Sequence, residues 1–101
     1  VAIDATKVAF VSSKKGTGAY LPAQFFTSDL QRLEIDVNGS IAPGTAALAT
    51  NATSGFIYMT TSAGAPTGVP TAKTGRVAIH YDTTNNRFYI YNGAWRSVLL
   101  S

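Results

Sequence analysis

The alternation of apolar and polar positions is clearest near the C-terminal end of the chain. In residues 76–82, RVAIHYD, every second residue is a large apolar one, which is the period of a half-buried strand. Residues 87–91, RFYIY, and residues 95–100, WRSVLL, are rich in the aromatic and β-branched types that favour strands. These three segments predict an antiparallel β-meander.

Short polar segments separate the alternating ones. Thr83–Asn86 is expected to form a polar turn, because Asn tolerates positive φ. Asn92–Gly93 favours a two-residue type I′ turn, which needs positive φ at both positions. A second Asn–Gly pair, Asn38–Gly39, follows Leu30–Val37, which also alternates. Two such pairs predict an antiparallel β architecture.

The rest of the chain is expected to contain further strands and loops. Val1–Val11 alternates loosely and Phe56–Thr61 is strongly apolar, so each is predicted to be a strand. Residues 12–18, SSKKGTG, are expected to form a solvated hairpin tip, and residues 40–55 an irregular connection. Residues 62–75 combine Pro and Gly without periodicity, and loops of this length tend to bind something.

These elements predict an all-β fold, either an antiparallel β-sandwich or a small barrel, that ends in the C-terminal β-meander. The length of 101 residues fits one domain. We expect residues 1–29 to form an N-terminal strand and arm with a possible attachment role, and residues 30–101 to form the antiparallel β domain, the two making one compact unit. Phe25 and Phe26 are candidates for a contact with the core or with a neighbouring subunit.

Composition changes this picture in one respect, which is the surface. Only 13% of the residues are charged, about half the usual share, while 46% are hydrophobic. Small residues take the place of charged ones and make a poorly solvated surface for a monomer. This favours a surface that is hidden against other copies of the chain or against a larger assembly. No apolar run reaches the 18 residues that a membrane span requires, so no membrane partner is expected.

The net charge of +3 comes from the C-terminal half. Beyond residue 50 there is one carboxylate, Asp82, and four cations: Lys73, Arg76, Arg87 and Arg96. Well-spaced cations are typical of an ordinary solvated face, and no dense Lys/Arg stripe of the kind that follows a phosphate backbone is present. Nucleic acid is therefore not an expected partner.

The residue types that carry catalysis are sparse. His80 is the one histidine, and Asp82 lies on the same strand face two residues later. A catalytic His also needs a nucleophile, yet the Gly-x-Ser-x-Gly turn that would present a serine is missing. One His and five scattered carboxylates form no metal-ligand set, and cysteine is absent. We therefore expect no enzyme activity, no cofactor and no metal.

Aromatic residues are the remaining candidates for a binding site. Exposed rings beside polar side chains can stack on sugars. The candidate contact residues for a partner or a glycan are Arg87, Tyr89, Tyr91 and Trp95. Because one strand face meets the core, we expect Phe88 and Ile90 to face inward and the alternate residues of RFYIY to face outward. The reverse assignment is the alternative.

Several segments between residues 30 and 97 resemble those of tailed-bacteriophage virion proteins. The segment LQRLEIDVNGSI, residues 30–41, resembles the RL-I-x-x-N-G-x-I pattern of phage fibres and appendages. Further similar segments are SGFIY at 54–58, GAPTGVPT at 64–71, TGR at 74–76, YDTTNN at 81–86 and FYIYNGAW at 88–95. The resemblance lies in turn and strand residues rather than in a catalytic signature.

This resemblance implies a non-enzymatic virion structural protein, either a capsid-decoration or head-fibre subunit or a tail-fibre or appendage subunit. Such a subunit would assemble through β-surface contacts, as a homotrimer, with the capsid or the tail as its partner. Its location would be the virion, assembled in the cytoplasm of the bacterial host. The alternative is a carbohydrate-binding β module that attaches to a glycan on the host surface.

Overall fold

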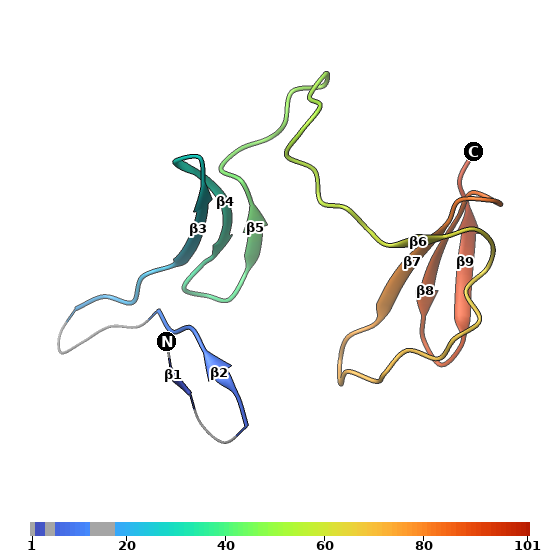
Figure 1. The fold of residues 1–101 in the computed structure, drawn as a ribbon, viewed down its shortest axis with the longest axis horizontal. Coiled ribbons are helices and arrows are strands. Elements are labelled where there is room, and N and C mark those ends of the chain that lie inside the picture. Colours follow the sequence, from blue (N-terminus) through green and yellow to red (C-terminus); the bar gives the residue numbers. More distant parts are fainter. Residues whose placement is uncertain (1, 4–5, 13–17) are drawn as a thin grey trace. The chain divides into compact units, whose positions relative to one another are not determined.

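The computed structural model describes residues 2–3, 6–12 and 18–101. Within these ranges it has nine strands and no helix, so the expected all-β fold is confirmed (Figure 1). The chain divides into two compact units, Val1–Ile57 and Tyr58–Ser101. In the ranges that the structure describes, no helix has the length and apolar character needed to cross a membrane.

The first strands of the chain are short. β1 (Ala2–Ile3) pairs antiparallel with β2 (Val8–Ala9), with Ala2 opposite Ala9. The prediction of one continuous strand over Val1–Val11 is therefore wrong, because the chain reverses between Ile3 and Val8. The predicted hairpin tip falls largely on residues 13–17, which lie outside the described residues.

The other sheet of the first unit has three antiparallel strands in the order β3-β4-β5. These are β3 (Ala23–Thr27), β4 (Leu30–Ile35) and β5 (Ile41–Pro43). Ser28 and Asp29 join β3 to β4 with φ angles of 51° and 61°, the left-handed values of a type I′ turn. The predicted turn at Asn38–Gly39 is confirmed between β4 and β5.

This sheet changes the expected division of the chain. A boundary at residue 29 would cut the β3–β4 hairpin, in which Thr27 pairs with Leu30. Residues 23–27 are thus a sheet strand rather than part of an arm, and the compact units divide between Ile57 and Tyr58. Backbone hydrogen bonds join β3 to β4, and the two strands therefore belong to one unit.

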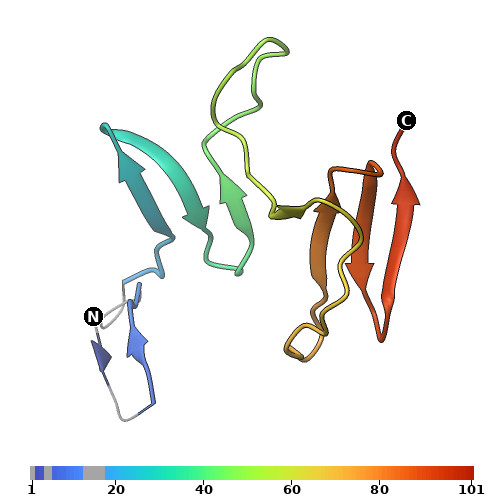
Figure 2. The same cartoon turned by 45° about the vertical axis from the view of Figure 1, so that its right-hand side comes forward.

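The second unit contains one four-stranded sheet, and Figures 1 and 2 show its strands side by side. It consists of β6 (Thr61–Ser62), β7 (Ala78–Asp82), β8 (Arg87–Tyr91) and β9 (Trp95–Leu99), in that order. β6 runs parallel to β7, whereas β7, β8 and β9 are antiparallel. The predicted C-terminal β-meander is confirmed.

The two turns of the meander differ. The polar turn after Asp82 forms as predicted, and Asn86 takes a φ of 56°. At the other end Tyr91 pairs with Trp95, so the loop has three residues rather than two. Only Gly93 has positive φ there, and the amide of Asn92 donates to the carbonyl of Ala94. The predicted type I′ turn at Asn92–Gly93 is therefore wrong.

The predicted strand over Phe56–Thr61 is also wrong for most of its length. Pairing with β7 begins only at Thr61, one residue after the Thr60 carbonyl accepts from the Tyr81 amide. Ile57 and Tyr58 are 77% and 86% exposed and lie where the two units meet in sequence. An apolar segment becomes a strand only where a neighbouring strand lies beside it, which sequence alone does not specify.

Candidate functional site

One face of the four-stranded sheet is covered by the segment that connects its first two strands. Residues 63–76, here called the strap, connect β6 to β7 and pass across the sheet (Figures 1 and 2). The strand register places a common set of side chains under the strap, here called the covered face. Its members are Ala78, His80, Asp82, Arg87, Tyr89, Tyr91, Trp95, Ser97 and Leu99, of which Leu99 stays 58% exposed.

Asp82 fastens the start of the strap and the next turn together. Its side chain is fully buried, and Oδ1 accepts hydrogen bonds from the amides of Gly64, Thr84 and Asn85 at 2.9, 2.9 and 3.1 Å. Oδ2 accepts a fourth hydrogen bond, 2.8 Å long, from the side-chain amide of Asn85. A single carboxylate therefore closes the β7–β8 turn and holds residue 64 against the sheet.

These hydrogen bonds also set the protonation of Asp82. Burial acts to raise the pKa of its carboxyl, but the hydrogen bonds from the Asn85 side chain and from the amides of Asn85, Thr84 and Gly64 act to lower it. The hydrogen bonds prevail, and the pKa lies below its ordinary value. Asp82 is thus ionised at neutral pH, and both of its carboxylate oxygens accept hydrogen bonds from within the fold.

His80 and Ser62 lie close enough to suggest a catalytic pair, but their hydrogen bonds run the wrong way. His80 Nε2 is 2.8 Å from Ser62 Oγ, while Ser62 Oγ donates to the carbonyl of Gly64 at 2.9 Å. The histidine nitrogen must then donate to the serine oxygen, so it does not act as the base that a serine nucleophile needs. His80 Nδ1 contacts Thr60 Oγ1 at 3.5 Å rather than a carboxylate. These hydrogen bonds instead hold β6 against β7.

Trp95 fastens the middle of the strap. Its indole Nε1 donates a 2.7 Å hydrogen bond to the carbonyl of Gly68. Its ring meets Tyr91 edge to face at 5.2 Å between centroids, and meets Tyr89 in the same manner at 6.2 Å. Edge-to-face packing of this kind stabilises aromatic clusters beyond simple burial. The cluster joins β8 and β9 to the strap.

The predicted outward direction of the tyrosines is wrong. Tyr89 is 9% exposed, and it is the one hydrophobic side chain classed as buried in the described ranges, whereas Ile90 is 38% exposed. The reverse assignment is correct, because the strap lies on the tyrosine side, where Asp82 and Trp95 bind its backbone. Tyr89 cannot stack on a sugar ring in this conformation.

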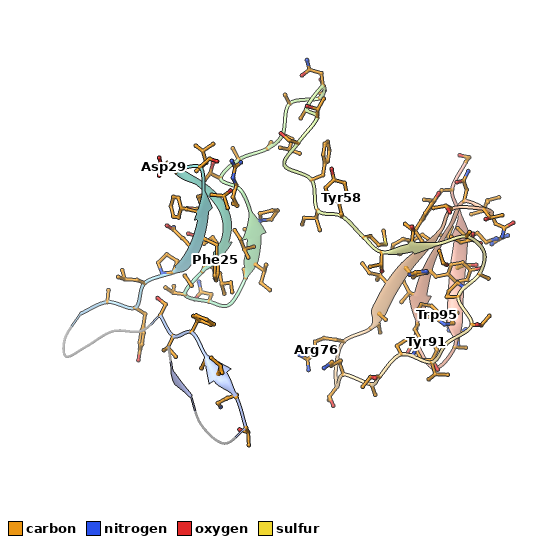
Figure 3. The ribbon with its side chains drawn as sticks, in the orientation of Figure 1. Phe25, Asp29, Tyr58, Arg76, Tyr91 and Trp95 are labelled. Carbon is orange, nitrogen blue, oxygen red and sulfur yellow. The ribbon has the colours of Figure 1, made fainter. Side chains whose placement is uncertain are left out.

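The other sequence-predicted residues remain partly or largely accessible. Tyr91 and Trp95 are half-buried, and Arg87 donates to the hydroxyl of Ser97 at 3.2 Å. Phe25 and Phe26 lie in β3 at a β-bulge and are 51% and 56% exposed. Figure 3 shows Tyr91 and Trp95 in the four-stranded sheet and Phe25 in the other unit. The structure therefore brings Arg87 and the three aromatics to one face, and leaves the phenylalanines in a separate unit.

A shallow hollow lies within each unit. The hollow of the second unit lies between the end of the strap and the β8–β9 turn, and its mostly apolar lining also includes Lys73, Arg76, Tyr91 and Asn92. The hollow of the first unit is more apolar, and its lining includes Phe26, Leu30, Leu33, Ile41, Leu48 and Phe56. Across the ranges described, no three His, Cys, Asp or Glu residues gather as a metal site would require.

Sequence reasoning missed the residues that hold the strap. Asp82 is not predicted to hold the strap, although its position before Thr-Thr-Asn-Asn is typical of a carboxylate that caps a turn. No local pattern links Ser62 to His80 or Trp95 to Gly68, because these pairs are 18 and 27 residues apart.

No family model, no curated protein and no solved structure matches this chain.

Proposed function

We propose that this chain is a non-enzymatic structural subunit of a tailed-bacteriophage virion, of the fibre, appendage or capsid-decoration kind. The segments between residues 30 and 97 that resemble phage virion proteins support this reading. The resemblance lies in strand and turn residues, and the fold is all-β with a C-terminal meander.

A single observation carries the proposal, which is the amount of apolar surface. Large hydrophobic side chains are exposed along nearly the whole described chain, from Val8 at 61% to Leu100 at 46%. In the same ranges only Tyr89 is a buried hydrophobic residue. A soluble monomer seldom leaves so much of its apolar surface in water, because burying it is the main favourable term in folding. The chain is therefore suited to bury this surface in an assembly.

The assembly that we propose is a homotrimer attached to the capsid or the tail of the virion. Low charge density supports it, since few charged side chains would have to be desolvated when copies pack together. The exposed Phe25 and Phe26 are proposed contacts of this assembly.

The first test is the molar mass of the purified chain, measured by light scattering over a range of concentrations. The expected result is a trimer whose mass does not change with concentration. A monomer at every concentration would contradict the assembly. The location is tested by labelling purified virions with an antibody to the chain, and particles that bear no label would contradict a virion subunit.

A carbohydrate-binding module for host attachment is the second candidate. The hollow beside the strap favours it, because two cations, an amide and the ring of Tyr91 line the same depression. Rings and polar groups of this kind recognise sugars. Figure 3 shows Arg76 at the end of the strap and Tyr91 in the sheet.

Variants on this hollow separate the two candidates. Arg76→Ala and Tyr91→Ala are expected to remove binding on a glycan array and to leave the trimer mass unchanged. Arg32→Ala is the matched control, because Arg32 is an exposed cation on β4 of the first unit. Wild-type protein that binds no glycan would contradict the module without affecting the virion proposal.

A further inference from the structure

The side of the four-stranded sheet away from the strap presents a regular apolar surface. The strand register forms two rows across it, Ile79–Ile90–Arg96 and Tyr81–Phe88–Val98. These six residues are here called the open face. Val77 and Leu100 continue the alternation at the ends of β7 and β9 and are 54% and 46% exposed.

The second unit does not cover the open face with a segment of its own. Ile79, Ile90 and Val98 are 50%, 38% and 54% exposed, although each lies within a paired strand. The strap is fastened on the other side, where the Trp95 indole and the Asp82 carboxylate bind it. The exposure of the open face therefore follows from the route of the strap.

We infer that the open face packs against the open faces of other copies of this chain. The inference rests on the proposed function and names the surface through which the subunits assemble. In a trimer, three sheets can surround a common axis with their open faces inward, and one side of each open face then meets the other side of the neighbour's open face.

The size of the open face suits this partner. Its side chains, of which Tyr81 and Phe88 are partly buried, together present on the order of 400 Å² of apolar surface, within the range of the largest such patch on a typical monomer. A stable interface buries about 800 Å² from each partner. The open face thus supplies the centre of such an interface, and Val77, Leu100 and the strand edges supply the remainder.

The charge and shape of the open face also favour another copy. Arg96 is its only charged residue, and Arg96 lies on β9 at the edge of the sheet, where it can reach solvent from the rim. The face offers no carboxylate to a basic partner. An identical sheet has the same strand lengths and width, and its backbone groups are already paired within their own ladder, so two such sheets can pack face to face.

The chain contains no cysteine, so single cysteines can map this contact. Ile90→Cys places a thiol on an inner strand near the centre of the open face. Val69→Cys is the matched control, because Val69 is 78% exposed but belongs to the strap. On mild oxidation, Ile90→Cys is expected to form a covalent dimer inside the trimer, leaving one copy unpaired. Val69→Cys is expected to stay uncross-linked at the same protein concentration.

The scattering mass of the same samples distinguishes the possible failures. A trimer in which Ile90→Cys stays uncross-linked, or cross-links no better than Val69→Cys, overturns the open-face contact and leaves the proposed function standing. A wild-type monomer overturns both proposals. A second pair guards against a misfolded variant: Ile79→Lys should reduce the mass to that of a monomer, whereas Val69→Lys should not. Circular dichroism verifies that each variant retains its sheet.

Discussion

The two faces of the four-stranded sheet belong to the same strands but differ in how far their side chains are buried. On the covered face Asp82 is fully buried and Tyr89 is 9% exposed. On the open face Ile79 and Val98 remain 50% and 54% exposed. Three aliphatic side chains of the open face, Ile79, Ile90 and Val98, are thus left largely in water while a carboxylate and a tyrosine are buried, contrary to simple hydrophobic ranking.

The difference shows that a loop and a sheet pack against chemically different surfaces. A loop brings unpaired amides and carbonyls, and each must find a partner when it is buried. The covered face provides such partners, namely the Asp82 carboxylate for the Gly64 amide and the Trp95 indole for the Gly68 carbonyl. The aliphatic side chains of the open face provide none. They suit a second sheet, whose own backbone hydrogen bonds are already made.

Removing the carboxylate that fastens the strap is expected to have the largest effect on the covered face. Asp82→Ala would leave the amides of Gly64, Thr84 and Asn85 without their acceptor, and unpaired buried donors are costly. We expect the largest fall in the denaturation midpoint of any substitution described here. The measurement is urea unfolding followed by the fluorescence of Trp95.

Asp82→Asn is the matched control for this variant. It keeps one oxygen acceptor of similar size, so it should lose less stability than Asp82→Ala. Equal midpoints for wild type and Asp82→Ala would show that the strap is held without this carboxylate.

Tyr89→Ala is expected to cost about 3 kcal/mol of unfolding free energy, as is usual when a large buried ring is removed. Tyr89 contacts Trp95 and is the most buried apolar side chain of the covered face. Tyr89→Phe keeps the ring and should cost less than about 1 kcal/mol. A loss from Tyr89→Ala no larger than that from Tyr89→Phe would contradict the assignment of Tyr89 to the core.

Acid should weaken the covered face through Asp82. The pKa of Asp82 is lower in the folded chain than in the unfolded chain, so the unfolded chain binds its proton first as the pH falls. The stability from Asp82 is therefore complete above the unfolded pKa of about 4 and is lost as the pH falls through the lower folded value. Unfolding midpoints measured between pH 7 and pH 2 should show this decline.

Asp82→Asn separates this effect from the other carboxylates. The variant should lose the part of the acid decline that belongs to residue 82. An unchanged decline would assign the acid sensitivity to other groups.

The period-two pattern predicted the meander and the two sets of residues on its faces, but not which set is covered. Both faces of RFYIY are apolar enough to be core, and the choice depends on where the strap lies. The strap is placed by contacts across 18 residues, Gly64 to Asp82, and across 27 residues, Gly68 to Trp95. Such long-range pairs leave no periodic signal in the sequence.

Turn chemistry was predicted with similar partial success. The Asn–Gly pairs do mark chain reversals, since this dipeptide tolerates positive φ. The type I′ turn nevertheless lies at Ser28–Asp29, where both residues have positive φ without glycine. There the pairing of Phe25 and Thr27 with β4 leaves only two residues for the connection. Register, set by the sheet, prevailed over local preference.

A smaller effect is expected from the hydrogen bond in the middle of the strap. Trp95→Phe keeps an aromatic ring but removes the donor to Gly68, at a cost of about 1 kcal/mol. The strap should then open more often, and trypsin should cleave faster after Lys73 and Arg76, which lie in it. Cleavage after Arg96, on the far face, is the internal control. If Trp95→Phe is cleaved after Lys73 and Arg76 no faster than the wild type, the role of Trp95 in holding the strap is contradicted.

The smallest effect is expected on the open face, and it should depend on protein concentration. Val98→Thr replaces a methyl group with a hydroxyl of similar size at a position that is 54% exposed. In dissociated chains the change should be below about 0.5 kcal/mol, as is usual for surface positions. If the open faces pack together, the same hydroxyl becomes buried without a partner, and the midpoint of Val98→Thr should fall below wild type as concentration rises. A difference that is the same at every concentration would place Val98 in a surface that does not take part in assembly, and the two faces would then differ only in how the strap covers one of them.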